Sequence, residues 1–355
     1  MHLFVDISSH GFGHLAITAP ALNALAEMAP ELRLTVRSGL PRQKLAQRIR
    51  APFSLIAGSS DFGYVMIDAM NIDLAASAAA YRRAHVDWPA RVAREAAFLA
   101  ALEADLVLTS VSYLPLAGAA RAGIPALSLC SLNWAGLFAH FFGREPWAAP
   151  IHAAMLAAYR GAHAFLRVTP GMAMEELGNV ADVGPIAAIG RRHDLGLNGD
   201  KAVLIALGGI AHRLPVEDWP RTPGIRWLVD ADWQCAHPDA LARESFGLDF
   251  TDLLSSVDAV ITKPGYGTFT EAACNGTPVL YRKRDDWPEQ DCLIDWLRRN
   301  AACREIPAAC LVHGALADSL HALWQQPPRP RPAATGAAAA AARICRQLLR
   351  EYLAE

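Results

Sequence analysis

The sequence lacks the features that mark several specialised classes of protein. Charged residues make up only 19% of the 355 residues, and with a formal net charge of −2 we expect no nucleic-acid partner. The seven cysteines, an odd number, form no Cys-x-x-Cys pair and no zinc spacing, which indicates reduced thiols. The N-terminus has no basic segment before its first apolar residues, so we expect no secretion signal and a cytoplasmic location.

The chain has the apolar content and the length that two separate cores require. Hydrophobic residues make up 53% of the sequence. Chains longer than about 250–300 residues usually divide into domains. Short apolar segments alternate with helical patterns, which predicts βα units and parallel sheets. We therefore predict an α/β fold of two Rossmann-like, doubly wound domains that face a cleft, at residues 1–190 and 191–332, with a linker near 184–201.

The apolar segments predict nine strands. Those of the first domain are expected at residues 3–8, 32–37, 106–109, 125–129 and 164–168, and those of the second at 202–207, 225–229, 259–262 and 278–281. Helical patterns include one long segment at 75–103 and a final Ala-rich helix at 333–353. In doubly wound sheets, ligands bind at the carboxyl ends of the strands.

The first loop, residues 8–16, joins an expected strand to an expected helix. Gly11 and Gly13 let the backbone turn tightly beside a ligand. His14 lies in the first helical turn, where the helix N-terminus would lower its pKa, so that a neutral imidazole can accept a proton from a hydroxyl. Alternatively, the glycines serve only the turn and His14 has no chemical role. Both interpretations stay open on these residues alone.

The same loop also satisfies a dinucleotide-binding pattern, Gly-x-Gly-x-x-Ala, with Gly11, Gly13 and Ala16. The acidic residue that would bind the ribose of NAD is absent after the second strand. Arg37 and Ser38 stand there instead and would suit a 2′-phosphate. An NADP-linked oxidoreductase is therefore an alternative function.

A second glycine-rich turn follows the strand expected at 259–262. Gly265 and Gly267 precede Thr268, which we expect to open a helix whose free N–H groups suit a phosphate or diphosphate. Glu271 follows one turn later. It either forms a capping box with Thr268 or accepts the two hydroxyls of a ribose.

These motifs carry a resemblance to a known family. Residues 263–278, KPGYGTFTEAACNGTP, resemble the donor-nucleotide segment of GT-B glycosyltransferases. Residues 282–290, RKRDDWPEQ, and 10–14, HGFGH, resemble the glycosyltransferase-like N-terminal domain of L-arabinokinases and, more distantly, the N-acetylglucosaminyltransferase of peptidoglycan synthesis. The resemblance implies transfer of a sugar from a nucleotide-diphosphate sugar, such as a UDP-sugar, to an acceptor hydroxyl without a cofactor. It also implies that the helix at 333–355 crosses back to the first domain.

The resemblance also implies roles for single residues. His14 would be the general base, Glu271 the ribose ligand, and Glu289 with Gln290 the pair that holds the donor sugar. The other candidate donor-side residues are Gly208, Gly209, Gly265, Gly267, Thr268, Arg282 and Phe250, of which Phe250 either covers the base or belongs to the core. On the acceptor side the candidates are His10, Gly11, Gly13 and Asn133.

The sequence departs from the family at the partner of His14. Related transferases often carry an aspartate there, whereas this chain has Ser110 and Ser112, which cannot stabilise an imidazolium as a carboxylate would. Asp6 or the donor phosphate could substitute. Asp230 and Asp232 spell the Asp-x-Asp of metal-dependent sugar transferases, but the surrounding pattern is of the metal-independent kind, and we predict no metal site.

Three further alternatives remain open. The aromatic segment 134–142 is either core or, if exposed, the site of an aromatic or lipid-linked acceptor with a peripheral membrane contact. A nucleotide-sugar epimerase or hydrolase could use the same donor site without a separate acceptor. A noncatalytic nucleotide-sugar-binding protein would bind the donor without turnover.

Overall fold

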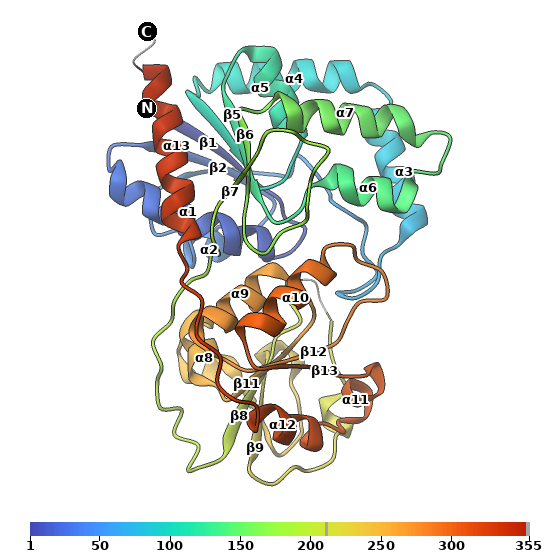
Figure 1. Ribbon diagram of the computed structural model, residues 1–355, viewed down its shortest axis with the longest axis vertical. Coiled ribbons are helices and arrows are strands. Elements are labelled where there is room, and N and C mark those ends of the chain that lie inside the picture. The colour runs from blue at the N-terminus through green and yellow to red at the C-terminus, as the bar shows by residue number, and fades with distance from the viewer. Residues whose placement is uncertain (210–211, 353–355) are drawn as a thin grey trace. The chain divides into compact units, whose positions relative to one another are not determined.

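The computed structural model describes residues 1–209 and 212–352 and divides into two compact units (Figure 1). Unit 1 comprises Met1–Ile67, Ile72–Ile186 and the C-terminal residues from Thr335 onward. Unit 2 comprises Asp68–Asn71 and Ala187–Ala334. Each unit has its own parallel sheet, so each is described by itself.

Unit 1 is built on a seven-stranded sheet in which the strand order is β3-β2-β1-β4-β5-β6-β7 and every pairing is parallel. The strands are β1 (His2–Ile7), β2 (Arg33–Ser38), β3 (Ser54–Ala57), β4 (Leu106–Thr109), β5 (Ala126–Cys130), β6 (Ala164–Arg167) and β7 (Val180–Asp182). Val5 of β1 pairs with Val36 on one side and Leu108 on the other. The strand order reverses between β1 and β4, which places a topological switch point at the loop after β1.

Eight helices of unit 1 lie within the described residues. They are α1 (Gly13–Met28), α2 (Arg42–Ala46), α3 (Leu74–His85), α4 (Trp88–Ala101), α5 (Leu114–Ala122), α6 (Trp134–Phe142), α7 (Ala148–Gly161) and α13 (Gly336–Tyr352). The long helix predicted at 75–103 is two helices, because Asp87 caps a new N-terminus and a proline stands in the first turn of α4.

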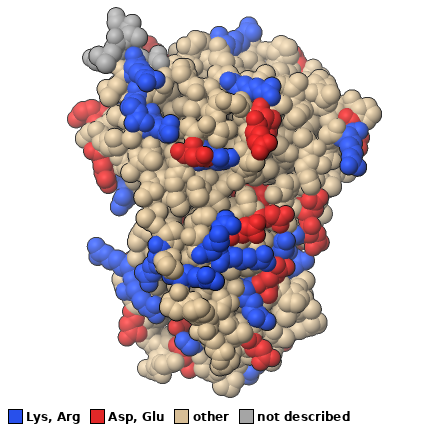
Figure 2. Space-filling model, viewed as in Figure 1, with Lys and Arg blue, Asp and Glu red and all other residues tan. Residues whose placement is uncertain are grey.

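The C-terminal helix α13 packs against α1 in unit 1 (Figure 1). Ala340, Ala341, Ile344 and Leu348 are at most 1% exposed, at the spacing of one helix face. Basic side chains lie along its outer side (Figure 2). Leu353, the last residue of the helix predicted at 333–353, is outside the described residues.

Unit 2 repeats the architecture with a six-stranded parallel sheet of order β10-β9-β8-β11-β12-β13. The strands are β8 (Lys201–Ile205), β9 (Ile225–Val229), β10 (Ala240–Ala242), β11 (Ala259–Thr262), β12 (Val279–Tyr281) and β13 (Cys303–Glu305). The helices are α8 (Phe250–Ser256), α9 (Tyr266–Asn275), α10 (Gln290–Asn300), α11 (Ala308–His313) and α12 (Ala317–Trp324), and 3-10 turns lie at Val216–Asp218, Ala231–Trp233 and Arg243–Phe246. The switch point of this sheet lies between β8 and β11.

The cores form on the faces of these sheets. All residues of β4 and β11 are buried, as expected of parallel strands that helices cover on both faces. In unit 2, Trp227 of β9 is fully buried and meets the ring of Trp219 edge to face at 5.1 Å. The predicted α/β class with two doubly wound parallel sheets is confirmed.

No helix among the described residues combines the length and the apolar character that crossing a lipid bilayer requires.

Candidate functional site

The predicted donor-side residues of unit 2 lie at the carboxyl ends of three adjacent strands. Gly208 and Gly209 follow β8 and are exposed, and Gly208 has a positive φ of 95° that favours glycine. Gly265 is the N-cap residue of α9, which follows β11, and no side chain caps this helix end. The backbone N–H groups at the start of α9 therefore point away from the helix toward any ligand that lies there.

The helix α9 begins two residues earlier than predicted, at Tyr266. Thr268 lies within the first turn and is not the N-cap residue. The expected capping box of Thr268 with Glu271 is therefore wrong, because a capping box needs its first residue at the N-cap.

Glu271 lies on the second turn of α9 and is 1% exposed. Burial and then the charge of Glu271 raise the pKa of the nearby Cys274 thiol to about 11, so Cys274 is an unreactive thiol at neutral pH. Phe250, predicted to cover the base, is the first residue of α8 and is half-buried.

The pair predicted to hold the donor sugar makes hydrogen bonds within its own loop. The Gln290 side chain accepts a hydrogen bond from the backbone N of Arg284 at 2.9 Å and donates one to the backbone O of Arg284 at 3.1 Å. The indole Nε1 of Trp287 donates to the Glu289 carboxylate at 3.1 Å. Arg282 forms an ion pair with Asp285 at 3.5 Å. This loop, residues 282–290, is therefore a self-supported turn after β12.

Sequence reasoning missed two cations of this region, Lys263 and Arg284. A Cβ built on Gly208 would lie 3.4 Å from the Lys263 Nζ, and one on Gly265 would lie 3.9 Å from it. The amine therefore lies between the glycine turn after β8 and the start of α9. Burial, followed by the charge of Arg284, holds the Lys263 pKa well below its usual value. The sequence did offer a signal for them, because Lys263 belongs to the motif at 263–278 and Arg284 to the motif at 282–290.

In unit 1, His14 is the second residue of α1 and is 7% exposed. Burial lowers its pKa to about 4, so the imidazole is neutral at pH 7. The expected lowering of the pKa is present, but its cause is burial rather than the helix N-terminus. The Nδ1 atom lies 3.7 Å from the Cys130 Sγ.

The two glycines beside His14 differ in whether the backbone conformation requires glycine. Gly11 has a φ of 106°, which favours glycine. Gly13 has no such φ, and a Cβ there would have no neighbour within 4 Å. The fold itself does not require glycine at residue 13, and the start of α1 leaves room for a ligand atom.

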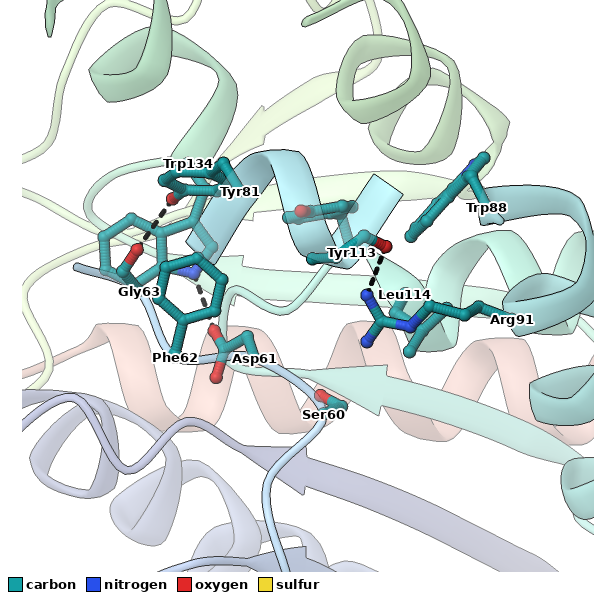
Figure 3. Close-up of a pocket in the computed structure, with 11 residues that line it drawn as sticks. Ser60, Asp61, Phe62, Gly63, Tyr81, Trp88, Arg91, Tyr113, Leu114 and Trp134 are labelled. Atoms are coloured by element: carbon teal, nitrogen blue, oxygen red, sulfur yellow. Dashed lines mark hydrogen bonds between the residues drawn. The ribbon is translucent and has the colours of Figure 1, made fainter. Parts of the chain in front are cut away.

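Trp134 connects the two histidines of the first loop to a carboxylate. The ring centroids of His10 and His14 lie 5.3 and 5.7 Å from that of Trp134, both edge to face. The indole Nε1 donates to Asp61 Oδ2 at 2.7 Å (Figure 3). Sequence reasoning missed Asp61, which follows the short strand β3 and carries no local motif.

Asp61 lies near Ser112, one of the two serines that stand where the family's orienting aspartate was sought. Burial and then the charge of Asp6 raise its pKa to about 6, while the hydrogen bond from Trp134 and the nearby Ser8 and Ser112 work in the opposite direction. Ser110 and Ser112 are fully buried. A carboxylate from another loop thus stands beside Ser112, although its hydrogen bond is to Trp134.

Asp6, the proposed substitute partner of His14, is engaged elsewhere. Arg37 Nε donates to Asp6 Oδ2 at 2.6 Å, and the Ser60 hydroxyl donates to Oδ1 at 2.7 Å. Arg37 also donates from both terminal nitrogens to Glu95, at 3.1 and 2.6 Å. Arg37 is therefore not available for the 2′-phosphate of NADP, and the oxidoreductase alternative loses its main support.

Asn133, a predicted acceptor-side residue, is 1% exposed and caps α6. Its Oδ1 accepts from the Gly136 N at 2.7 Å, and its Nδ2 donates to Glu176 at 3.2 Å. The aromatic segment that follows is mainly core, since Trp134 and Phe138 are fully buried. The peripheral membrane contact is expected only for the case that this segment is exposed, and within it Phe141 is half-buried and His140 is exposed.

A small pocket of unit 1 lies beside Asp61 (Figure 3). Its walls come from residues 60–63, α3, α4 and the starts of α5 and α6. The Tyr81 hydroxyl donates to the Gly63 O at 2.7 Å, and Arg91 donates to the Ala84 O at 2.6 Å. Five of the eleven lining residues are aromatic, and Asp61 is the carboxylate among them.

Within the described residues, no group of three or more His, Cys, Asp and Glu side chains is placed to hold a metal ion. Asp230 of the Asp-x-Asp pattern forms an ion pair with Arg243. On the face shown in Figure 2, Lys and Arg side chains are interspersed with Asp and Glu.

Comparison with known proteins identifies the fold to which this chain is similar. No protein-family model matches the chain. The sequence is similar to that of an L-arabinokinase of Arabidopsis thaliana, at 24% identity over 304 residues, which are 82% of this chain. The chain spans about 29% of the length of that relative.

Solved structures match nearly the whole chain. The glycotransferase of kitacinnamycin has a TM-score of 0.63 at 15% identity, covering 99% of this chain and 95% of its own. The fold is the GT-B fold. A protein from Listeria monocytogenes described as a UDP-N-acetylglucosamine 2-epimerase has a TM-score of 0.56 at 15% identity, covering 100% of this chain and 97% of its own. The GT-B fold therefore occurs with more than one reaction, and the chemistry must be argued from the residues.

Proposed function

We propose that this GT-B protein is a glycosyltransferase that moves a sugar from a nucleotide-diphosphate sugar to an acceptor hydroxyl without a metal ion. The observation that carries the proposal is the start of α9, which has no side-chain cap and has a lysine amine beside it and a buried glutamate one turn further. These are the groups that a diphosphate and a ribose require. The likeness to a glycotransferase and to a UDP-sugar epimerase supports a nucleotide sugar, with a UDP-sugar as the first candidate.

On the donor side, the free N–H groups of Gly265, Gly267 and Thr268 would bind the diphosphate and offset the charge that builds up on it as it leaves. Fixed dipoles of this kind need no reorganisation during the reaction, so they stabilise the transition state more than the substrate. Glu271 would accept the ribose hydroxyls. Glu289 and Gln290 would hold the donor sugar, since each side chain can make further hydrogen bonds besides those within its loop.

On the acceptor side, His14 would take the proton of the attacking hydroxyl. Its pKa of about 4 keeps the imidazole in the neutral, proton-accepting form throughout the physiological range. The same low pKa makes it a weak base, so proton transfer would accompany departure of the diphosphate rather than precede it. We also propose a cytoplasmic location, which the seven free thiols support.

The test is thermal unfolding with UDP, dTDP, GDP and NADP for the wild type and for Glu271→Gln. A ligand at 100 times its Kd adds about 2.7 kcal/mol to the unit that binds it. We expect one nucleoside diphosphate to raise the Tm, and Glu271→Gln to weaken its binding roughly 10- to 150-fold, as loss of a hydrogen bond to a charged group does. The matched control is Glu305→Gln, on the edge strand β13, which should leave the shift unchanged.

Two results would count against the proposal. A shift with NADP alone would favour an oxidoreductase, and binding without turnover over many acceptors would favour a noncatalytic protein. Incubation with the donor alone separates the remaining alternatives, because a hydrolase would release free sugar and an epimerase would return an isomeric donor.

A further inference from the structure

Arg284 is a buried cation whose hydrogen-bonding groups are not used by the fold. It lies in the loop after β12 and is 8% exposed. Its Nε and Nη1 atoms are buried and meet no hydrogen-bond acceptor within the described residues. The guanidinium lies 4.5 Å from the ring centroid of Trp287, which fixes its plane. Burial without acceptors is costly for such a group, and it lowers the Arg284 pKa to about 10.

The neighbouring cations of the loop behave differently. Arg282 pairs with Asp285 at 3.5 Å, and Lys283 pairs with Asp291 at 3.2 Å. Both are more exposed than Arg284. The fold thus provides carboxylate partners for the two cations that water already solvates, and leaves the buried guanidinium without one in direct contact.

Lys263 supplies a second basic group to the same place. Lys263 follows β11, and Arg284 lies in the loop after β12. The two strands are adjacent and parallel, so both residues lie at the carboxyl ends of the strands. The charge of Arg284 contributes to the lowered pKa of Lys263, which places the two cations within electrostatic reach of each other. Glu289 is the acidic group that acts on both. A bound anion would favour the charged forms of Lys263 and Arg284, which burial disfavours.

We propose that Lys263 and Arg284 form an oxyanion-binding pair in unit 2 that takes either a phosphate of the donor diphosphate or a carboxylate on the donor sugar. The proposal rests on the proposed function and deepens it. A guanidinium held flat on an indole presents fixed N–H groups, which suit the paired oxygens of a carboxylate or phosphate. The amine of Lys263, beside Gly208 and the start of α9, contributes as a point charge.

The test measures Kd by isothermal titration for UDP, UDP-glucose and UDP-glucuronic acid, with dTDP and GDP as further diphosphates. The variants are Arg284→Met and Lys263→Met, and the control Lys283→Met removes an exposed cation of the same loop. We expect each test variant to weaken binding about 10- to 100-fold, the range for loss of a hydrogen bond to a charged group. Equal weakening of all ligands would assign the pair to a phosphate, and weakening of UDP-glucuronic acid alone would assign it to a sugar carboxylate.

The Tm of the ligand-free variants separates binding from a purely structural role. Replacing a buried, unpartnered guanidinium by an apolar chain should leave the Tm unchanged or raise it. Arg284→Lys keeps the charge without the planar group and should retain part of the affinity, which keeps the test decisive if Arg284→Met does not fold. Unchanged affinities in the variants, with the wild type binding a nucleoside diphosphate, would overturn the pair alone. A wild type that binds none of these ligands would overturn the proposed function as well.

Discussion

The buried carboxyl of Asp61 predicts an unusual stability effect. Its folded-state pKa of about 6 lies above the ordinary value of 3.8. Between these two pH values the folded chain holds the proton more tightly than the unfolded chain, so raising the pH through this window lowers the free energy of unfolding. The two pKa values differ by about 2, which corresponds to a loss of about 3 kcal/mol in the free energy of unfolding. This loss is absent below pH 3.8 and complete above pH 6.

Substitution Asp61→Asn removes this charge and keeps a side-chain oxygen for the Trp134 indole. We expect the variant to match the wild type near pH 4 and to be more stable by up to about 3 kcal/mol at pH 7. Urea unfolding, followed by pulsed hydrogen exchange of unit 1 peptides, measures the unit that contains the substitution. The difference between variant and wild type should grow steadily from pH 4 to pH 6.5.

A matched control uses the same chemical change in the same unit. Asp182 lies on β7, and hydrogen bonding from Arg167 lowers its pKa. Its carboxylate stabilises the folded state above its unfolded pKa, and this stability is lost as the pH falls through the folded pKa. Asp182→Asn should therefore lose a little stability at pH 7, since the pair is largely exposed. Destabilisation of Asp61→Asn at pH 7, or a difference that does not vary with pH, would refute the argument for Asp61.

Two further predictions concern buried groups of unit 1. His14→Ala should lower turnover by about 10²- to 10⁴-fold while leaving the Kd of the nucleotide unchanged, and the wild-type loss of activity due to this group in acid should be centred near pH 4; unchanged turnover would remove His14 from the mechanism. Arg37→Met leaves Asp6 and Glu95 buried without their cation and should lower the free energy of unfolding by about 3–5 kcal/mol, with urea unfolding as the measurement. A loss below 1 kcal/mol would mean that the two carboxylates behave as surface groups.

The sequence predicts the interior of both sheets better than their edges. All nine predicted strands are interior strands, and the four that were missed, β3, β7, β10 and β13, are the four edge strands. Interior strands of parallel sheets are covered on both faces, so they are continuous apolar segments. No residue of the four edge strands is fully buried, and each is only three or four residues long, so they carry no such signal.

The residues of the candidate site also differ in how well the sequence predicts them. The turns that contain His14 and Gly265 could be predicted from local motifs, because a loop between a strand and a helix is a local structure. Asp61 could not be found, since its partner Trp134 is 73 residues away and only the fold joins them. The roles expected of Glu289 and Gln290 depend on side-chain hydrogen bonds that spacing does not reveal.

The return of α13 to unit 1 has a consequence for the order in which the chain can fold during synthesis. About 150 residues of unit 2 are made between the end of β7 and the start of α13. At about 5–20 residues per second, this delays the last helix of unit 1 by roughly 7–30 s. Unit 2 is complete in sequence before unit 1, although it is synthesised second. The helix that holds His14 therefore receives its packing partner only after unit 2 has been synthesised.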